Sequence, residues 1–148
     1  MTIPADHPKI KPAKIGVILA NLGTPDATDY WSMRKYLSQF LSDKRVVDYS
    51  AWLWQPLLQG IILTRRPFSS GKAYRSIWNN ELNESPLLTT TRLQANAVKK
   101  EVEKIYGNDV IVDLAMRYGN PSTESVIKNL KDQGVEKIVF FPLYPQYA

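Results

Sequence analysis

The sequence predicts an α/β fold in which helices cover both faces of a parallel sheet. Three short apolar runs have the character of strands, and longer segments with helically spaced apolar residues separate them. Gly and Pro stand at most of the boundaries between these segments. Because strands and helices alternate along the chain, the strands are expected to run parallel and to be joined by right-handed crossovers.

The first predicted strand is Ile15–Asn21, a continuous apolar run typical of a strand buried on both faces. It ends at Asn21–Pro25, where Gly and Pro favour a turn. A helix is expected to begin near Thr28 or Asp29, since both are good N-cap residues. Its apolar residues at helical spacing are Trp31, Tyr36, Leu37, Phe40 and Leu41.

The middle of the chain is predicted to be helical. A charged connection, Ser42–Arg45, leads to the most hydrophobic segment, Ala51–Leu63. This segment is too short to span a bilayer and is followed by Thr64–Pro67, so it is interpreted as a core helix or as an interfacial lip. A further helix is expected around Ser70–Asn79, carrying Tyr74, Ile77 and Trp78.

A long helix is expected to open at Pro86 and to close at Gly107. The residues predicted to form its buried face are Ala95, Val98, Val102 and Ile105. The second predicted strand, Asp109–Arg117, follows this helix.

The last predicted helix starts at Pro121–Glu124 and ends before Gly134. Its predicted buried residues are Val126, Ile127 and Leu130. The third strand is predicted at Glu136–Leu143, and its apolar centre, Lys137–Phe141, is expected to be buried.

Two regions are predicted along the chain. Residues 1–13 contain three prolines and no apolar periodicity, so they are expected to form a mobile arm. That arm holds the only histidine, His7, to which no catalytic or metal-binding role is assigned. Residues 14–148 are expected to form one incomplete domain, because three strands are few for such a sheet and a proline- and tyrosine-rich loop directly follows the third.

The composition restricts the classes of function. Residues 1–75 hold 11 Lys and Arg against 5 Asp and Glu, whereas residues 76–148 hold 8 against 9. This asymmetry indicates either a basic surface without a partner or a surface that binds an anionic partner. The anionic partner could be a small molecule or a membrane surface. No recognised motif supports binding to nucleic acid. The chain has no cysteine, so a metal would need oxygen or nitrogen ligands. A soluble, cytoplasmic protein is expected, because neither a signal peptide nor a long apolar run is present.

The turn after the first strand does not have the sequence of a nucleotide-binding loop. Asn21–Pro25 lacks the second and third glycines of a dinucleotide-binding turn, and it lacks the Lys-Ser/Thr pair of a P-loop. A nucleotide cofactor is therefore not expected. As a bare Gly-Pro turn, the segment would have no functional meaning.

Five short motifs occur in order along the chain: Asn21–Pro25, Arg65–Pro67 followed by Tyr74, Glu84–Pro86, Met116–Tyr118, and Phe141–Tyr147. Together they resemble the N-terminal half of ferrochelatase, the enzyme that inserts ferrous iron into a porphyrin in haem synthesis. The likeness runs from about Lys14 to the last residue. It implies a Rossmann-like, chelatase-type sheet, the first of two similar domains with the porphyrin in the cleft between them, and a second domain absent from this chain.

The resemblance implies substrate-binding roles for Leu22, Arg66, Tyr74, Ser85, Arg117 and Tyr147. Arg66 matches a position that binds a propionate, a role suited to a bidentate guanidinium, and Tyr74 and Ser85 match positions that hydrogen-bond the same group. Leu22 matches a position against the macrocycle face near the metal. Arg117 matches an arginine lining the inner site, and Tyr147 matches a tyrosine of the cleft wall.

Structural alternatives stand beside these roles. Arg65–Arg66 would serve equally well as the cationic end of a helix, and Arg117 as one partner of an ion pair at a strand end. Tyr144, next to the cleft-wall position, would pack in the core. The sequence also departs from the family at Asn79–Asn83, where many members have a short glycine-rich turn.

The family's catalytic histidine and glutamate lie beyond Ala148, so the resemblance implies no catalytic residue, no bound metal and no cofactor in this segment. The segment is expected to supply cleft residues and to be inactive alone. Protoporphyrin IX or a related porphyrin and ferrous iron would be substrates of the whole enzyme, and a C-terminal iron–sulfur cluster is left open. Trp52–Leu63 resembles the family's hydrophobic lip, which makes peripheral membrane contact an alternative to substrate packing. The competing functional hypothesis is a self-contained flavodoxin-like module that binds an anionic small molecule.

Overall fold

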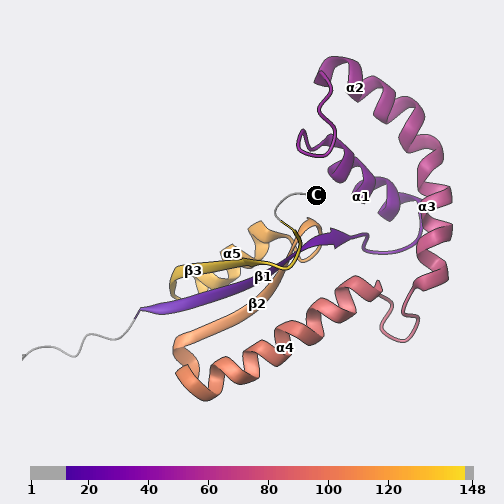
Figure 1. Ribbon diagram of the computed structural model, residues 1–148. Helices are drawn as coiled ribbons and strands as arrows, with labels where there is room; N and C mark the ends of the chain where they lie inside the picture. Colours follow the sequence, from indigo (N-terminus) through magenta and orange to yellow (C-terminus); the bar gives the residue numbers. More distant parts are fainter. Residues whose placement is uncertain (1–12, 146–148) are drawn as a thin grey trace, which may run out of the picture.

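Three parallel strands form one sheet in the order β2, β1, β3 (Figure 1). The computed structural model describes residues 13–145 of the chain. The strands are β1 (Lys14–Thr24), β2 (Val110–Gly119) and β3 (Val135–Pro142). β1 is central, and its Val17 lies opposite both Val112 of β2 and Val139 of β3. The predicted parallel sheet is confirmed, and each strand overlaps the run predicted for it.

Two helices cover the opposite faces of this sheet. α4 (Pro86–Tyr106) packs on β1 and β2 through a cluster that includes Leu19 and Ala95, whereas α5 (Thr123–Asp132) packs through a cluster that includes Ile18 and Leu130. Successive side chains of a strand point to opposite faces, so neighbours on β1 meet different helices. The predicted arrangement with helices on both faces is confirmed.

The remaining helices lie beyond the carboxyl end of the sheet instead of on its faces (Figure 1). They are α1 (Tyr30–Ser42), α2 (Ala51–Leu57), the π-helical turn η1 (Leu58–Ile62) and α3 (Leu63–Ile77). Their shared core contains Met33, Leu37, Leu58, Leu63 and, from β2, Tyr118. This layer places α1 and α3 at the edge of the sheet where ligands bind in open α/β folds.

α2, η1 and α3 follow one another without a break, which corrects the expectation that a further helix begins only around Ser70. Pro67 lies inside α3, and a proline has no N–H to donate to the carbonyl of the residue four positions earlier, here Leu63. That carbonyl accepts hydrogen bonds from the Tyr30 hydroxyl (3.0 Å) and from Arg34 Nη1 (2.7 Å). The Leu63 carbonyl is therefore hydrogen-bonded to α1 instead of to residue 67, so the helix continues through Pro67.

The helix ends follow the local sequence closely. The Asp29 side chain caps α1 by accepting from the backbone N–H of Trp31 (2.9 Å) and of Ser32 (3.1 Å). Gly107 ends α4 and begins the short 3-10 turn η2 (Gly107–Asp109), and Ser122 caps α5. The expected N-cap at Asp29 and the expected ends of the long helix at Pro86 and Gly107 are confirmed.

Several burial predictions are wrong. Trp31 and Ile105 are each 72% exposed, and Ile127 is 39% exposed, so they do not belong to the cores of their helices. On β3 the predicted buried centre is open, with Val139 50% exposed and Phe141 56% exposed. β3 is an edge strand of the described sheet, and within residues 13–145 no further strand pairs with its outer side. The predicted mobile arm, residues 1–13 with His7, lies outside the described residues except for Ala13.

None of the helices within residues 13–145 combines the length and the apolar character that a membrane crossing requires.

Candidate substrate-binding site

The register of β1 and β2 brings Leu22 and Arg117 to the same level at the carboxyl edge of the sheet. Asn21 pairs with Met116 and Gly23 pairs with Tyr118, so the residues between them lie opposite each other. Leu22 is 37% exposed. Its backbone N–H donates to the Asn21 side chain at 2.8 Å, and that side chain is held in turn by Thr91 of α4 at 2.9 Å. An apolar side chain therefore stands next to a cation at this edge.

Arg66 and Tyr74 lie two turns apart on α3, in the layer that caps this edge. Arg66 is exposed, and its guanidinium forms no hydrogen bond or ion pair with residues 13–145. Because it lies in the first turn of α3 and not at a helix C-terminus, the helix-end alternative for Arg65–Arg66 is wrong. Arg66 is thus a cation without a partner in the described chain.

Tyr74 is partly buried against the core of the helical layer. Its ring lies edge-on to Tyr36 at 6.4 Å and to Trp78 at 6.5 Å between centroids. Burial raises the pKa of Tyr36, and the neighbouring Tyr74 raises that pKa further. The Tyr36 hydroxyl also donates to the Gly23 carbonyl at 3.3 Å. Tyr74 is therefore linked through one tyrosine to Gly23, the residue of β1 that follows Leu22; β1 continues to Thr24, so the turn predicted at Asn21–Pro25 is wrong for its first four residues.

Ser85 is the N-cap of α4 and is only 2% exposed. Its hydroxyl oxygen accepts from the backbone N–H of Leu88 at 3.2 Å, which leaves the hydroxyl proton free to be donated to another group. The preceding turn closes through paired backbone hydrogen bonds between Asn79 and Glu84. Asn83 has a φ of 50° there, and asparagine tolerates this conformation well, so the turn forms without the family's glycines.

Arg117 takes part in a closed hydrogen-bond network, which we call the Asp43 network, with Asp43 at the C-cap of α1 and with Tyr118. Arg117 Nη2 donates to Asp43 Oδ2 at 2.5 Å, and Arg117 Nε donates to the Tyr118 hydroxyl at 2.9 Å. That hydroxyl donates to the same Asp43 oxygen at 2.8 Å. The ion-pair alternative for Arg117 is therefore confirmed.

The electrostatics of the Asp43 network favour its charged form. The backbone N–H of Arg45, followed by Arg117 and Tyr118, lowers the pKa of Asp43 to about 2. Hydrogen bonds to Tyr118 and Asp43 raise the pKa of Arg117, and Tyr144 of the segment after β3 also contributes. Asp43 and Arg117 therefore carry opposite charges at every pH at which the protein would work.

Sequence reasoning missed Asp43 and Tyr118 as members of the site. Asp43 lies in Ser42–Arg45, which looks like an ordinary charged connection, and it meets Arg117 across 74 positions of the chain. No local pattern reports such a contact. Tyr118 follows Arg117 directly, so its membership in the Met116–Tyr118 motif was the one available signal.

Tyr147 lies outside the described residues, as does Gln146 beside it. Within residues 13–145, no three His, Asp or Glu side chains gather into a group that could hold a metal ion. The chain's only histidine is His7, also outside the described part.

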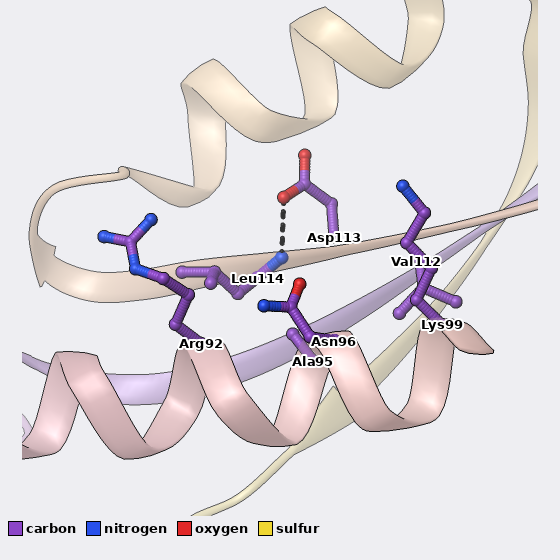
Figure 2. A pocket seen from close by; sticks show the side chains of 7 residues that line it. All are labelled: Arg92, Ala95, Asn96, Lys99, Val112, Asp113 and Leu114. Carbon is purple, nitrogen blue, oxygen red and sulfur yellow. Dashed lines mark hydrogen bonds between the residues drawn. The ribbon is translucent and has the colours of Figure 1, made fainter. Parts of the chain in front are cut away.

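Two hollows of similar size lie in the described chain, and none of the predicted substrate-binding residues lines either of them. One, of about 320 Å³, lies between α4 and β2 (Figure 2). The other, of about 370 Å³, is lined mainly by the apolar side chains of Tyr49, Leu53, Trp54 and Leu57. The second hollow belongs to the segment predicted to be a lip.

Comparison with known proteins identifies the family. The ferrochelatase family model matches residues 14–148. A ferrochelatase of Rhodobacter capsulatus is 62% identical over 146 residues, which cover 98% of this chain and 42% of that protein. A ferrochelatase of Agrobacterium fabrum is 56% identical over 146 residues, which cover 99% of this chain and 42% of that protein. A ferrochelatase of Rhizobium etli is 57% identical over 145 residues, which cover 98% of this chain and 42% of that protein. The chain thus spans 42% of the length of these curated relatives. Because the match extends over nearly all of its residues, the chain belongs to the ferrochelatase family.

Proposed function

We propose that the chain is the N-terminal part of a ferrochelatase, which inserts ferrous iron into protoporphyrin IX or a related porphyrin to form haem. The observation that carries this proposal is the arrangement at the carboxyl edge of the sheet. There the apolar Leu22 stands beside Arg117, and the neighbouring helix α3 presents Arg66, which has no ion-pair partner among residues 13–145. A flat apolar macrocycle with carboxylates at its rim needs both kinds of surface.

Within this proposal each predicted site residue has its own contact with the porphyrin. Arg66 forms a bidentate pair with a porphyrin carboxylate, because its guanidinium has no competing partner in residues 13–145. The Tyr74 and Ser85 hydroxyls donate to the same carboxylate, and Leu22 lies against the macrocycle. Tyr147, outside the described residues, matches a family tyrosine of the same cleft wall as Arg117. Ferrous iron is a substrate in this scheme.

The proposed chemistry needs a base to accept the pyrrole protons as the metal enters. His7 is the only histidine in the 148 residues, and no cysteine is present. Asp43, the carboxylate that bonds to Arg117, has a pKa of about 2 and is too weak a base near neutral pH. We therefore assign proton removal to a part of the enzyme outside this chain. The alternative of a self-contained module for an anionic small molecule has no support from the family match.

Replacing Arg66 tests the proposal. In the full-length enzyme, Arg66→Ala should raise the KM for porphyrin by roughly tenfold or more, because a charge-assisted pair contributes about 1.5–3 kcal/mol. The matched control is Arg65→Ala, which removes the same charge from an adjacent exposed position. Fluorescence-monitored insertion of zinc, as probe metal, into protoporphyrin measures both variants. Equal KM values for the two variants would contradict the role of Arg66, and absence of insertion by the wild-type enzyme would contradict the proposed function.

Peripheral membrane contact through Trp52–Leu63 is a second part of the proposal. Trp52 is 74% exposed, and Leu53 and Ile61 are each 58% exposed, which gives α2 and η1 an uncovered apolar surface.

Co-sedimentation with anionic phospholipid vesicles checks this contact. Trp52→Ala should reduce the bound fraction several-fold, because a tryptophan buried in the interface contributes most of such binding. Trp31→Ala is the matched control, since Trp31 is equally exposed but lies on α1, outside the lip. Binding that Trp52→Ala leaves unchanged would show that this apolar surface serves another purpose.

A further inference from the structure

We propose that Asp43 is the positioning residue for Arg117, holding its guanidinium in one orientation at the carboxyl edge of the sheet. This inference rests on the proposed function, because it gives Arg117 a task in the cleft. It adds a residue that neither the sequence motifs nor the family resemblance contains. Asp43 would not touch the porphyrin; it would act only through Arg117 and Tyr118.

Asp43 is itself held firmly enough for such a task. Its Oδ1 accepts from the backbone N–H of Arg45 at 2.8 Å, and its carbonyl accepts from the N–H groups of Val46 (2.9 Å) and Val47 (3.0 Å). Its position at the C-cap of α1 joins the carboxylate to a helix whose inner face is buried. Both carboxylate oxygens and the backbone are therefore engaged, and the acceptor cannot turn away from Arg117.

The network restrains Arg117 at two of its three guanidinium nitrogens. Nη2 bonds to Asp43 and Nε bonds to Tyr118, whose ring lies 5.3 Å from the guanidinium carbon. A long, flexible side chain is thereby fixed before any ligand arrives, so less rotamer entropy is lost on binding. Nη1 bonds to neither of these two partners and is the nitrogen left to face a substrate at the level of Leu22, with Tyr144 after β3 also close to the guanidinium.

The ion pair with Asp43 also gives Arg117 a different electrostatic environment from that of Arg66. Arg66 has no anionic neighbour in the described residues and presents a full positive charge, whereas Asp43 compensates the charge of Arg117. An uncompensated arginine beside the centre of the macrocycle would repel an incoming divalent cation. The Asp43–Arg117 pair therefore has no net charge, and Arg117 remains a directed hydrogen-bond donor next to the path of the metal.

Asp43→Asn in the full-length enzyme tests this inference, because it keeps the shape of the side chain and removes its charge. With zinc as the probe metal and protoporphyrin as the acceptor, kcat should fall by roughly tenfold or more, as expected when a reacting group loses its orientation. The KM for porphyrin should change little, because Arg66 holds the carboxylate. The matched control is Asp132→Asn at the end of α5, which removes the same charge far from the edge and should behave as wild type.

A spectroscopic measurement makes the result independent of activity. In the wild-type protein the Arg117 Nε–H, which bonds to Tyr118, should give a protected, slowly exchanging NMR signal. Asp43→Asn should reduce that protection while the backbone amide signals persist, because Arg117 and Tyr118 both lose their charged acceptor. If Asp43→Asn does not fold, Tyr118→Phe removes the bridging hydroxyl and keeps the buried ring, and it should lower kcat in the same way.

The two proposals fail in different ways. If the wild-type enzyme inserts zinc and Asp43→Asn does so with unchanged kcat, the role of Asp43 is refuted and the proposed function stands. If the folded variant loses stability without loss of kcat per folded molecule, Asp43 is a structural residue only. If the wild-type enzyme inserts no metal, the proposed function fails, and the role of Asp43 in catalysis fails with it.

Discussion

Gly23→Ala should lower the free energy of unfolding by more than about 3 kcal/mol. Gly23 has a φ of +119°, and a Cβ built there would lie 1.9 Å from the carbonyl oxygen of Tyr118. The obstacle is backbone, which cannot move aside as a flexible side chain would. β1 and β2 would have to separate at their carboxyl ends, which is where Leu22 and Arg117 meet. Chemical denaturation measures the loss of stability.

Gly107→Ala is the control that separates the collision from the dihedral angle. Gly107 also has a positive φ, +59°, but no atom lies within 4 Å of its hypothetical Cβ. That substitution should therefore cost about 1–3 kcal/mol, the penalty for alanine at the φ of 59° and ψ of −136° that Gly107 adopts, without the added collision. If the two variants unfold at the same denaturant concentration, the close approach of Gly23 to Tyr118 does not constrain the fold.

Leu58→Ala should lower the free energy of unfolding by about 2–5 kcal/mol, the range for removing a buried leucine side chain. Leu58 is 0% exposed and packs into the core of the helical layer with Met33, Leu37 and Tyr118. It begins the π-helical turn η1, so it anchors the exposed apolar surface of α2 and η1 to α1. Increased hydrogen exchange of α2 amides should accompany the loss.

The adjacent Leu57→Ala provides the matched control for Leu58. Leu57 is 43% exposed, so its truncation should cost less than about 1 kcal/mol and should leave amide exchange in α2 unchanged. An equal cost at both positions would mean that burial does not distinguish them, and that the lip is not anchored through Leu58.

Much of the fold could be predicted because its signals are local. The Asp29 side chain bonds to N–H groups two and three residues later, and Pro86 and Gly107 act on the helix that they bound. Apolar runs likewise identified all three strands. The failures concern burial, since the apolar centre of β3 was expected to be covered and is exposed on an edge strand. Which strand stands at an edge depends on the order of strands, and no single run encodes that order.

The continuity of α3 through Pro67 has a similar cause. A proline inside a helix predicts a break, because it leaves one carbonyl unpaired. Here Tyr30 and Arg34 of α1 satisfy the Leu63 carbonyl from more than 28 positions away, so packing overrides the local preference. As a result Arg66 and Tyr74 share one helix instead of standing on either side of a turn.

Residues close together in the chain were enough to predict the α/β class, the helix ends and the ferrochelatase resemblance. They also gave the candidate residues Leu22, Arg66, Tyr74, Ser85, Arg117 and Tyr147. Which of the two arginines is paired depends on the folded chain. Arg117 meets Asp43 across 74 positions, whereas Arg66 meets no acid in the described residues. The physical reason is that an ion pair depends on distance in space, and the crossing of α1 over the end of β2 sets that distance.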